Sequence, residues 1–332
     1  MRGPWALVGA IALLLIAMAA GAAIGSVDVP LADVLTVIFG GPQAGTDATT
    51  AAIVWSVRLP RLCLGALVGA SLSASGAALQ GLFRNPLADP YVLGIAAGGA
   101  LGAAATLLLA LRGQAAVGAA PIGAFAGAAL AAATVWSLAR VADQLPLAGV
   151  LLAGVAVGLT CSAGVSLVLV LAETHAGDIL RWLLGDLGGR GFTEVGLVAL
   201  FAVPGLATLQ LTARALDALQ LGEDAARGLG VDARRTKLLV LGASALLVAG
   251  AVAFCGLIGF VGLIVPHAVR FFVGPGHRWL IPVAAVAGAA TLVAADLGAR
   301  VAMPDRALPV GVITGCLGGP FFLWLLRHRG LS

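Results

Sequence analysis

The sequence contains very little charge. Of its 332 residues only 10% are Asp, Glu, Lys or Arg, against about 25% in ordinary soluble domains. Such a chain cannot cover a folded surface with polar side chains, which excludes a soluble globular protein. With 61% hydrophobic residues and a mean hydropathy of +1.07, it has many runs of the ~20 residues that cross a bilayer as a helix. The alternation expected of a membrane β-barrel is missing, so we predict an all-α polytopic membrane protein.

Side chains that hold metals or drive catalysis are also scarce. The four cysteines, Cys63, Cys161, Cys255 and Cys316, each stand alone in an apolar run, and the histidines are equally scattered. Neither a metal site nor a cofactor is therefore expected in this chain. The only lysine, Lys237, lacks the glycine-rich context of a phosphate-binding loop. We expect no enzyme activity here, and the energy for any transport has to come from a separate subunit.

Charged and Pro/Gly clusters divide the apolar runs into about ten predicted spans, in one transmembrane domain covering 1–332. The expected limits are 5–25, 60–82, 91–111, 120–139, 147–171, 193–212, 237–255, 258–273, 279–299 and 308–326. The first run is long enough to span, and a signal peptide cleaved near Ala20-Gly21-Ala22 is the alternative for it.

The distribution of basic residues indicates the orientation. With an inner N-terminus, twelve of the 19 Lys and Arg fall in inner segments and seven in outer ones. Because positive charge favours the cytoplasmic side, both termini are expected in the cytoplasm. The segments 83–94 and 213–237 are expected on the same side.

The longest polar segment, 213–237, carries five basic and four acidic residues. Its leucine and alanine spacing predicts two short helices with a hinge at Gly222. Most connections are shorter than this one, and the pattern leaves an apolar face free. The segment is thus suited to a cytoplasmic partner; a plain solvated loop is the alternative.

The segment 83–94, FRNPLADPYVLG, interrupts the apolar runs with two prolines, which stop the second span. Its freed backbone is tolerable at membrane depth only if it is buried in protein or lines a watery cavity. The alternative is an interfacial turn in which Asp89 caps the third span.

Seven stretches together resemble the iron-chelate and cobalamin permeases of bacterial type II ABC importers. They are RLPRLCLGALVGASLSASGAALQGLFRNPLADPYVLG (58–94), LLAGVAVG (151–158), WLLGDLGG (182–189), LGEDAARGLGVD (221–232), GLIGFVGLIVPHAVR (256–270), ADLGAR (295–300) and LPVGVITGCLGGPFFLWLL (308–326). The resemblance covers essentially the whole chain. It implies ten spans per subunit in the bacterial inner membrane. It also implies a homodimer with two ATPase subunits, which hold ATP and Mg, and a periplasmic binding protein that delivers the substrate.

The resemblance also implies roles for particular residues. The residues expected to contact the ATPase are Leu221, Gly222, Glu223, Ala225, Gly228 and Gly230. Those expected to dock the binding protein are Arg58, Arg61 and Arg300, as exposed side chains. The gate and pathway residues are expected to be Asn85, Leu87, Leu147, Gly154, Gly158, Arg181, Gly311 and Gly315.

Each of these roles has a structural alternative. Arg58 and Arg61 would anchor a span in lipid headgroups, and Arg300 would pair with Asp296 four residues earlier. The glycines would serve helix packing. Arg181 would belong to an amphipathic interfacial helix.

The expected substrate is a metal chelate, ferric siderophore or haem, with cobalamin as the alternative within the family. Nucleic acid is not expected as a partner. A rival of another class is an ion-coupled secondary transporter. It would need acids deep in the spans, and Asp296 is the clearest internal one.

Overall fold

The computed structural model describes residues 2–25, 27–41, 43, 47–114, 117–139, 146–303 and 308–328, and every regular element among them is helical. In chain order the elements are α1 (Arg2–Ala23), α2 (Leu31–Gly40), α3 (Ala48–Ala52), η1 (Ile53–Arg58), α4 (Leu59–Leu82), η2 (Pro90–Leu93), α5 (Ile95–Leu111), η3 (Val117–Ala119), α6 (Ala120–Ala139), α7 (Leu147–Ala172), η4 (Glu173–His175), α8 (Ala176–Leu183), α9 (Phe192–Gln220), α10 (Glu223–Gly228), α11 (Ala233–Cys255), α12 (Val261–Val273), α13 (His277–Ala302) and α14 (Val310–His328).

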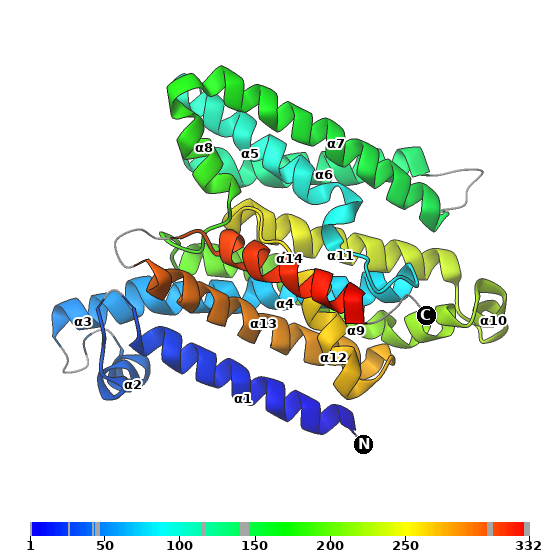
Figure 1. The fold of residues 1–332 in the computed structure, drawn as a ribbon, viewed down its shortest axis with the longest axis horizontal. Helices are drawn as coiled ribbons and strands as arrows, with labels where there is room; N and C mark the ends of the chain where they lie inside the picture. The colour runs from blue at the N-terminus through cyan, green and yellow to red at the C-terminus, as the bar shows by residue number, and fades with distance from the viewer. Residues whose placement is uncertain are drawn as a thin grey trace.

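Ten of these helices match the ten predicted spans, which confirms the predicted fold class. In the described part of the chain, α1, α4, α6, α7, α9, α11 and α13 account for the 7 helices long and apolar enough to cross a membrane. The remaining three, α5, α12 and α14, are apolar but shorter. Most of the long helices run along one common direction (Figure 1). Helices suit the bilayer because each satisfies its own backbone hydrogen bonds.

The central helix of the bundle is α4, which packs against α13, α9, α11 and α12. Its glycines allow neighbouring backbones to approach closely. A Cβ at Gly76 would lie 1.7 Å from the carbonyl oxygen of Gly262, and one at Gly69 would lie 2.3 Å from that of Gly288. The abundance of small residues in this chain therefore serves close helix packing at its centre.

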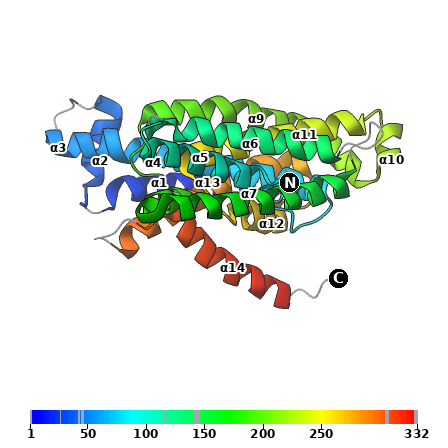
Figure 2. The same ribbon diagram turned by 90° about the horizontal axis from the view of Figure 1, so that it is seen from above.

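The shortest helices lie at the two ends of the bundle (Figure 1). α10 lies at one end, and both the first turn of α1 and the last turn of α14 point toward that end (Figure 1). The short helices α2, α3 and α8 lie at the opposite end. α14 diverges from the other helices along its length (Figure 2). Placing the α10 end in the cytoplasm stays a prediction from the charge distribution.

One local prediction was wrong, and one helix was not predicted at all. The first of two short helices expected in 213–237 does not exist as a separate element, because α9 continues unbroken to Gln220. Leu216 and Leu219 are buried and extend the packed face of α9. The sequence patterns also missed α2, whose Val34 and Val37 are buried against the bundle.

Candidate functional site

The three arginines predicted to dock a binding protein lie together at the end of the bundle opposite α10, around Asp296. Arg61 on α4 makes a two-pronged contact with this carboxylate of α13: its Nε lies 3.0 and 2.9 Å from the two oxygens, and its Nη2 lies 2.7 Å from Oδ1. Asp296 is only 1% exposed. Such paired hydrogen bonds are among the strongest that a guanidinium forms. Asp296 therefore joins α13 to α4.

Arg58 and Arg300 hold the end of α1. Nη1 of Arg58 donates to the carbonyl oxygens of Ala22 and Ala23 at 2.6 and 2.8 Å, and Nη2 donates to that of Val27. Nη2 of Arg300 donates to the carbonyl of Gly21 at 3.1 Å. The last carbonyls of a helix lack partners within it, and they carry partial negative charge. The two guanidinium groups therefore cap α1.

The expectation that these arginines are exposed was wrong. Arg58 is 4% exposed, and the side chains of Arg61 and Arg300 are 13% and 14% exposed. Internal acceptors occupy them: Nε of Arg300 lies 3.3 Å from Asp296, so the ion pair considered as the alternative is present. Asp186, whose side chain is 42% exposed, lies 3.8 Å from Arg61 at the open edge of the cluster. Docking on this cluster stays a prediction.

The predicted coupling segment forms an open surface at the other end of the bundle. Gly222 adopts a φ of +117°, which a residue with a side chain rarely adopts, and starts α10 directly after α9. Ala226 is fully buried, whereas Ala225, Gly228 and Gly230 are exposed, as is Leu221 at 71%. Leu229, part of the leucine and alanine spacing that predicted a helix here, is 66% exposed beside them. Small residues and two leucines thus offer a surface with room for a partner.

A buried lysine attaches this surface to the bundle. Nζ of Lys237 on α11 lies 2.6 Å from Oε1 of Glu223, and Lys237 is 8% exposed. The hydrogen bond from Lys237 lowers the pKa of Glu223 below its ordinary value, so the carboxylate is charged at neutral pH. Arg227 adds a contact within α10, 3.0 Å from Asp224. The sequence analysis used Lys237 to exclude a phosphate-binding loop and did not predict its contact with Glu223.

The predicted gate segment forms a turn between α4 and α5. Oδ1 of Asn85 accepts a hydrogen bond from the backbone N–H of Leu87 at 2.9 Å, and both residues are exposed. Asp89 accepts from the N–H of Tyr91 at 2.7 Å and caps η2. The alternative interpretation had Asp89 cap the third span, but the residue before α5 is Gly94. The hydroxyl group of Tyr91 bonds both the N–H and the carbonyl of Ile258, at 2.8 and 3.0 Å. The turn is therefore fixed to the segment before α12, and its role as a gate stays a prediction.

A cavity of about 340 Å³ is lined by residues of both the predicted gate and the predicted coupling segment. Its lining residues are Leu82, Phe83, Arg84, Leu147, Leu219, Gly222, Glu223 and Lys237. Arg84, one residue before Asn85, donates to the carbonyl of Leu219 at the end of α9. The cavity therefore lies between the end of α4, the start of α7 and the coupling segment.

The predicted pathway glycines lie in different surroundings. A Cβ at Gly154 would lie 2.3 Å from the carbonyl oxygen of Val92, and one at Gly311 would lie 2.2 Å from that of Leu184. Gly158 faces Gly94, whereas a Cβ at Gly315 would have no neighbour within 4 Å. Close packing thus explains Gly154 and Gly311 in this structure, and lining of the pathway stays a prediction for all four.

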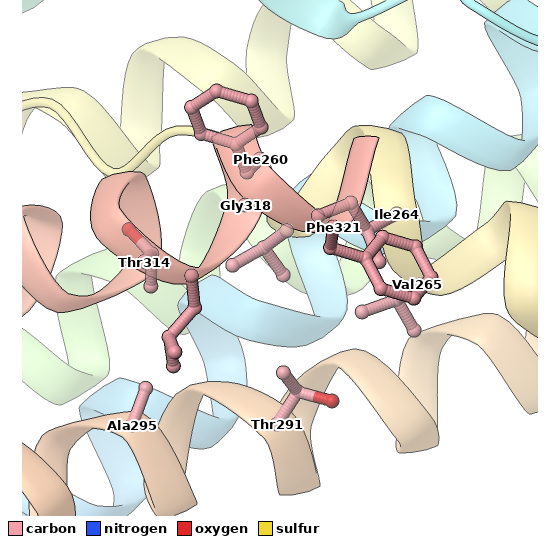
Figure 3. Close-up of a pocket in the computed structure, with 10 residues that line it drawn as sticks. Phe260, Ile264, Val265, Thr291, Ala295, Thr314, Gly318 and Phe321 are labelled. Atoms are coloured by element: carbon pink, nitrogen blue, oxygen red, sulfur yellow. The ribbon is translucent and has the colours of Figure 1, made fainter. Parts of the chain in front are cut away.

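An apolar cavity lies beside α14. It measures about 400 Å³ and is lined by Phe260, Val261, Ile264, Val265, Thr291, Ala295, Thr314, Leu317, Gly318 and Phe321 (Figure 3). These residues come from α12, α13, α14 and the residue before α12, so α14 is separated from its neighbours here. Arg181 lies elsewhere, exposed on α8 above the buried Ile179 and Leu183. That is the amphipathic helix considered as its alternative, and substrate contact stays a prediction.

Comparison with known proteins identifies the family. The model of the FecCD transport family matches residues 13–328. The chain is 44% identical to the cobalamin import system permease protein BtuC of Halobacterium salinarum, over 89% of this chain and 79% of that protein. It is 37% identical to the hemin transport system permease protein HmuU of Yersinia pestis, over 83% of this chain and 84% of that protein.

A structural comparison points the same way. A solved structure described as an inward-facing, metal-chelate type ABC transporter matches with a TM-score of 0.84 and 29% identity, over 98% of this chain and 100% of that chain. The match in sequence and the match in structure both extend over almost the whole chain. The chain therefore belongs to the FecCD transport family and is the multi-span permease of an ABC importer.

Proposed function

We propose that this permease moves a large metal chelate from the periplasm to the cytoplasm, with cobalamin as the first candidate. The observation that carries the proposal is the 44% identity to a cobalamin import permease along 89% of the chain. Haem is the second candidate, because a hemin permease is 37% identical. A ferric siderophore, which the sequence resemblance placed beside haem, is third. Substrate choice is expected to depend mostly on the binding protein.

The proposed working unit contains a second copy of this chain, two ATPase subunits and a periplasmic binding protein. ATP and Mg are held by the ATPases, and this chain carries out no covalent step. The exposed surface of α10 with Leu221 and Leu229 supports an ATPase contact, because small and apolar residues permit close packing. Charged neighbours such as Arg227 orient such a contact.

The proposed transport step starts when the loaded binding protein docks at the end that carries Arg61 and Asp186. ATP binding then draws the two ATPases together and displaces α10. Because the cavity beside Glu223 also contacts Arg84 and Leu147, that displacement reaches the ends of α4 and α7 first. The gate segment around Asn85 opens, and the chelate passes into the cytoplasm.

Reconstitution in vesicles tests this function. The permease, its ATPase and its binding protein are assembled, and ATP-driven uptake of labelled cobalamin, haem and a ferric siderophore is compared. We expect cobalamin uptake that disappears when the ATPase is replaced by a hydrolysis-dead variant. Uptake that persists with the dead ATPase and follows an imposed ion gradient would instead establish a secondary transporter.

A matched pair of variants tests the coupling surface. Gly228→Trp places a bulky side chain on the exposed face of α10 and is expected to abolish co-purification of the ATPase. Gly118→Trp, at a position where a Cβ would also meet nothing within 4 Å, serves as the control and is expected to retain the ATPase. Equal ATPase retention in both variants would contradict the assignment of α10.

A further inference from the structure

His277 begins α13 and is entirely buried. Its backbone N–H donates to Oδ1 of Asp217 on α9 at 2.9 Å, and its ring Nδ1 lies 2.7 Å from the same oxygen. An ionised carboxylate only accepts hydrogen bonds, so Nδ1 keeps its hydrogen and donates a hydrogen bond to Asp217. Nε2 of Gln220 lies 3.3 Å from the same Nδ1. One carboxylate oxygen thus ties both the backbone and the side chain of His277 to α9.

The opposite edge of the ring is pressed against α4. A Cβ built on Gly81 would lie 2.0 Å from Nε2 of His277 and 2.5 Å from Cε1. Nε2 is buried and has no hydrogen-bond partner among the described residues. The ring therefore fills the space that a side chain at position 81 would need, and only glycine fits beneath it.

The position of this contact connects the two sites described above. Asp217 lies four residues before Leu221, where the coupling segment begins, and Gly81 lies four residues before Asn85 in the gate segment. His277 starts the helix that carries Asp296 and Arg300 near its other end. One imidazole ring therefore joins the last turns of α4 and α9 to the first turn of α13.

We propose that His277 is a positioning residue that transmits movement of the coupling segment from α9 to α4 and α13. The proposal rests on the proposed function, because it needs an ATPase acting on α10. A chain of packed side chains is evidence for such transmission only when the coupling itself is measured. The competing role is purely structural: Asp217 would merely satisfy the unpaired N–H at the start of α13.

Two substitutions of His277 separate the contacts of its ring. His277→Asn keeps an amide nitrogen at the level of Nδ1, so it retains the bond to Asp217 and removes the atoms above Gly81. His277→Gln places its amide at the level of Nε2 and loses the Nδ1 donor. Gly81→Ala pushes the ring away from Asp217, and the double variant Gly81→Ala with His277→Asn gives the new methyl group its space.

The readouts are ATP hydrolysis, substrate transported per ATP, and thermal stability of the reconstituted complex. His277→Asn removes the ring atoms packed on Gly81, so it is expected to hydrolyse ATP but to transport less per ATP than the native chain. His277→Gln and Gly81→Ala are expected to hydrolyse ATP but transport at least about fivefold less per ATP, the lower end of ordinary coupling between sites. The double variant is expected to regain most of the native ratio.

The inference is overturned if the single variants lower thermal stability but leave transport per ATP unchanged, since that is the structural role. It is also overturned if the double variant transports no better than Gly81→Ala alone. Failure of the native chain to show ATP-driven transport would instead refute the proposed function. The two failures are therefore distinguishable.

Discussion

Replacing Asp296 with alanine is expected to destabilise the permease strongly. The carboxylate is 1% exposed and receives three short contacts from Arg61, while Arg300 lies 3.3 Å away. Asp296→Ala would leave both guanidinium groups, which are themselves mostly buried, without this counter-charge. Arg58, held at the end of α1, adds a third positive charge nearby.

The size of the effect follows from the burial. Removing one partner of a buried ion pair typically costs about 3–5 kcal/mol, because a charge remains buried without compensation. Asp186 provides the comparison, since it lies 3.8 Å from the same Arg61 but its side chain is 42% exposed. At 3.8 Å and with Asp186 partly in solvent, this pair is the weaker one, so Asp186→Ala, which also removes the acceptor of the Gly188 N–H, is expected to cost about 1 kcal/mol. The two variants should therefore differ by at least about 2 kcal/mol.

Reversible unfolding in mixed detergent micelles measures this difference as free energies of unfolding. Asp296→Asn is included because it keeps the shape and a hydrogen-bond acceptor while removing the charge, and it is expected to fall between the native chain and Asp296→Ala. If Asp296→Ala unfolded at the same denaturant fraction as Asp186→Ala, the reasoning would be refuted. The three arginines would then not depend on this carboxylate.

Three further predictions follow from contacts elsewhere in the bundle. Gly76→Ala is expected to prevent normal packing of α4 on α12 and to lower the folded yield, because the new Cβ would lie 1.7 Å from the carbonyl oxygen of Gly262. Gly9→Ala is the control: a Cβ there would have no neighbour within 4 Å, so the native yield is expected. Lys237→Met is expected to speed hydrogen exchange in α10, because Glu223 loses the contact that holds α10 on α11; unchanged exchange would argue against that role. Folding lowers the pKa of Glu223 from 4.5, so its stabilisation of α10 is expected to be complete above pH 4.5 and to be lost as the pH falls below that value. Hydrogen exchange of α10, measured against pH, should therefore become faster in acid. In Glu223→Gln this acid-dependent increase should be missing.

The spans could be predicted from sequence because a bilayer imposes a one-dimensional rule. Each span needs its own apolar run, so the predicted limits 60–82 and 279–299 fall close to the observed α4 and α13. The helical spacing of Asp296 and Arg300 also predicted their ion pair, since it is a local relation. Local patterns were thus sufficient for the helices and for contacts one turn apart.

Contacts between distant positions could not be predicted in this way. Arg61 is the main partner of Asp296, yet 235 residues separate them. The pairing of Glu223 with Lys237 requires α10 to fold back on α11, which no periodicity encodes. The assumption that Arg58, Arg61 and Arg300 are exposed failed for the same reason, because their acceptors on α1 and α13 become neighbours only in the folded bundle.

The packing also indicates which helices can be displaced with the smallest increase in free energy. α4 and α13 are joined by a buried ion pair, because Nη2 of Arg61 lies 2.7 Å from Oδ1 of Asp296. α14 instead borders an apolar cavity of about 400 Å³, and Leu317 on it is 66% exposed. On α7, Leu152 is 74% exposed. Displacing α14 or α7 exchanges one apolar surface for another, whereas separating α4 from α13 breaks the buried contact of Arg61 with Asp296. We therefore expect α4 and α13 to move as one body during transport, while α7 and α14 change their packing around them.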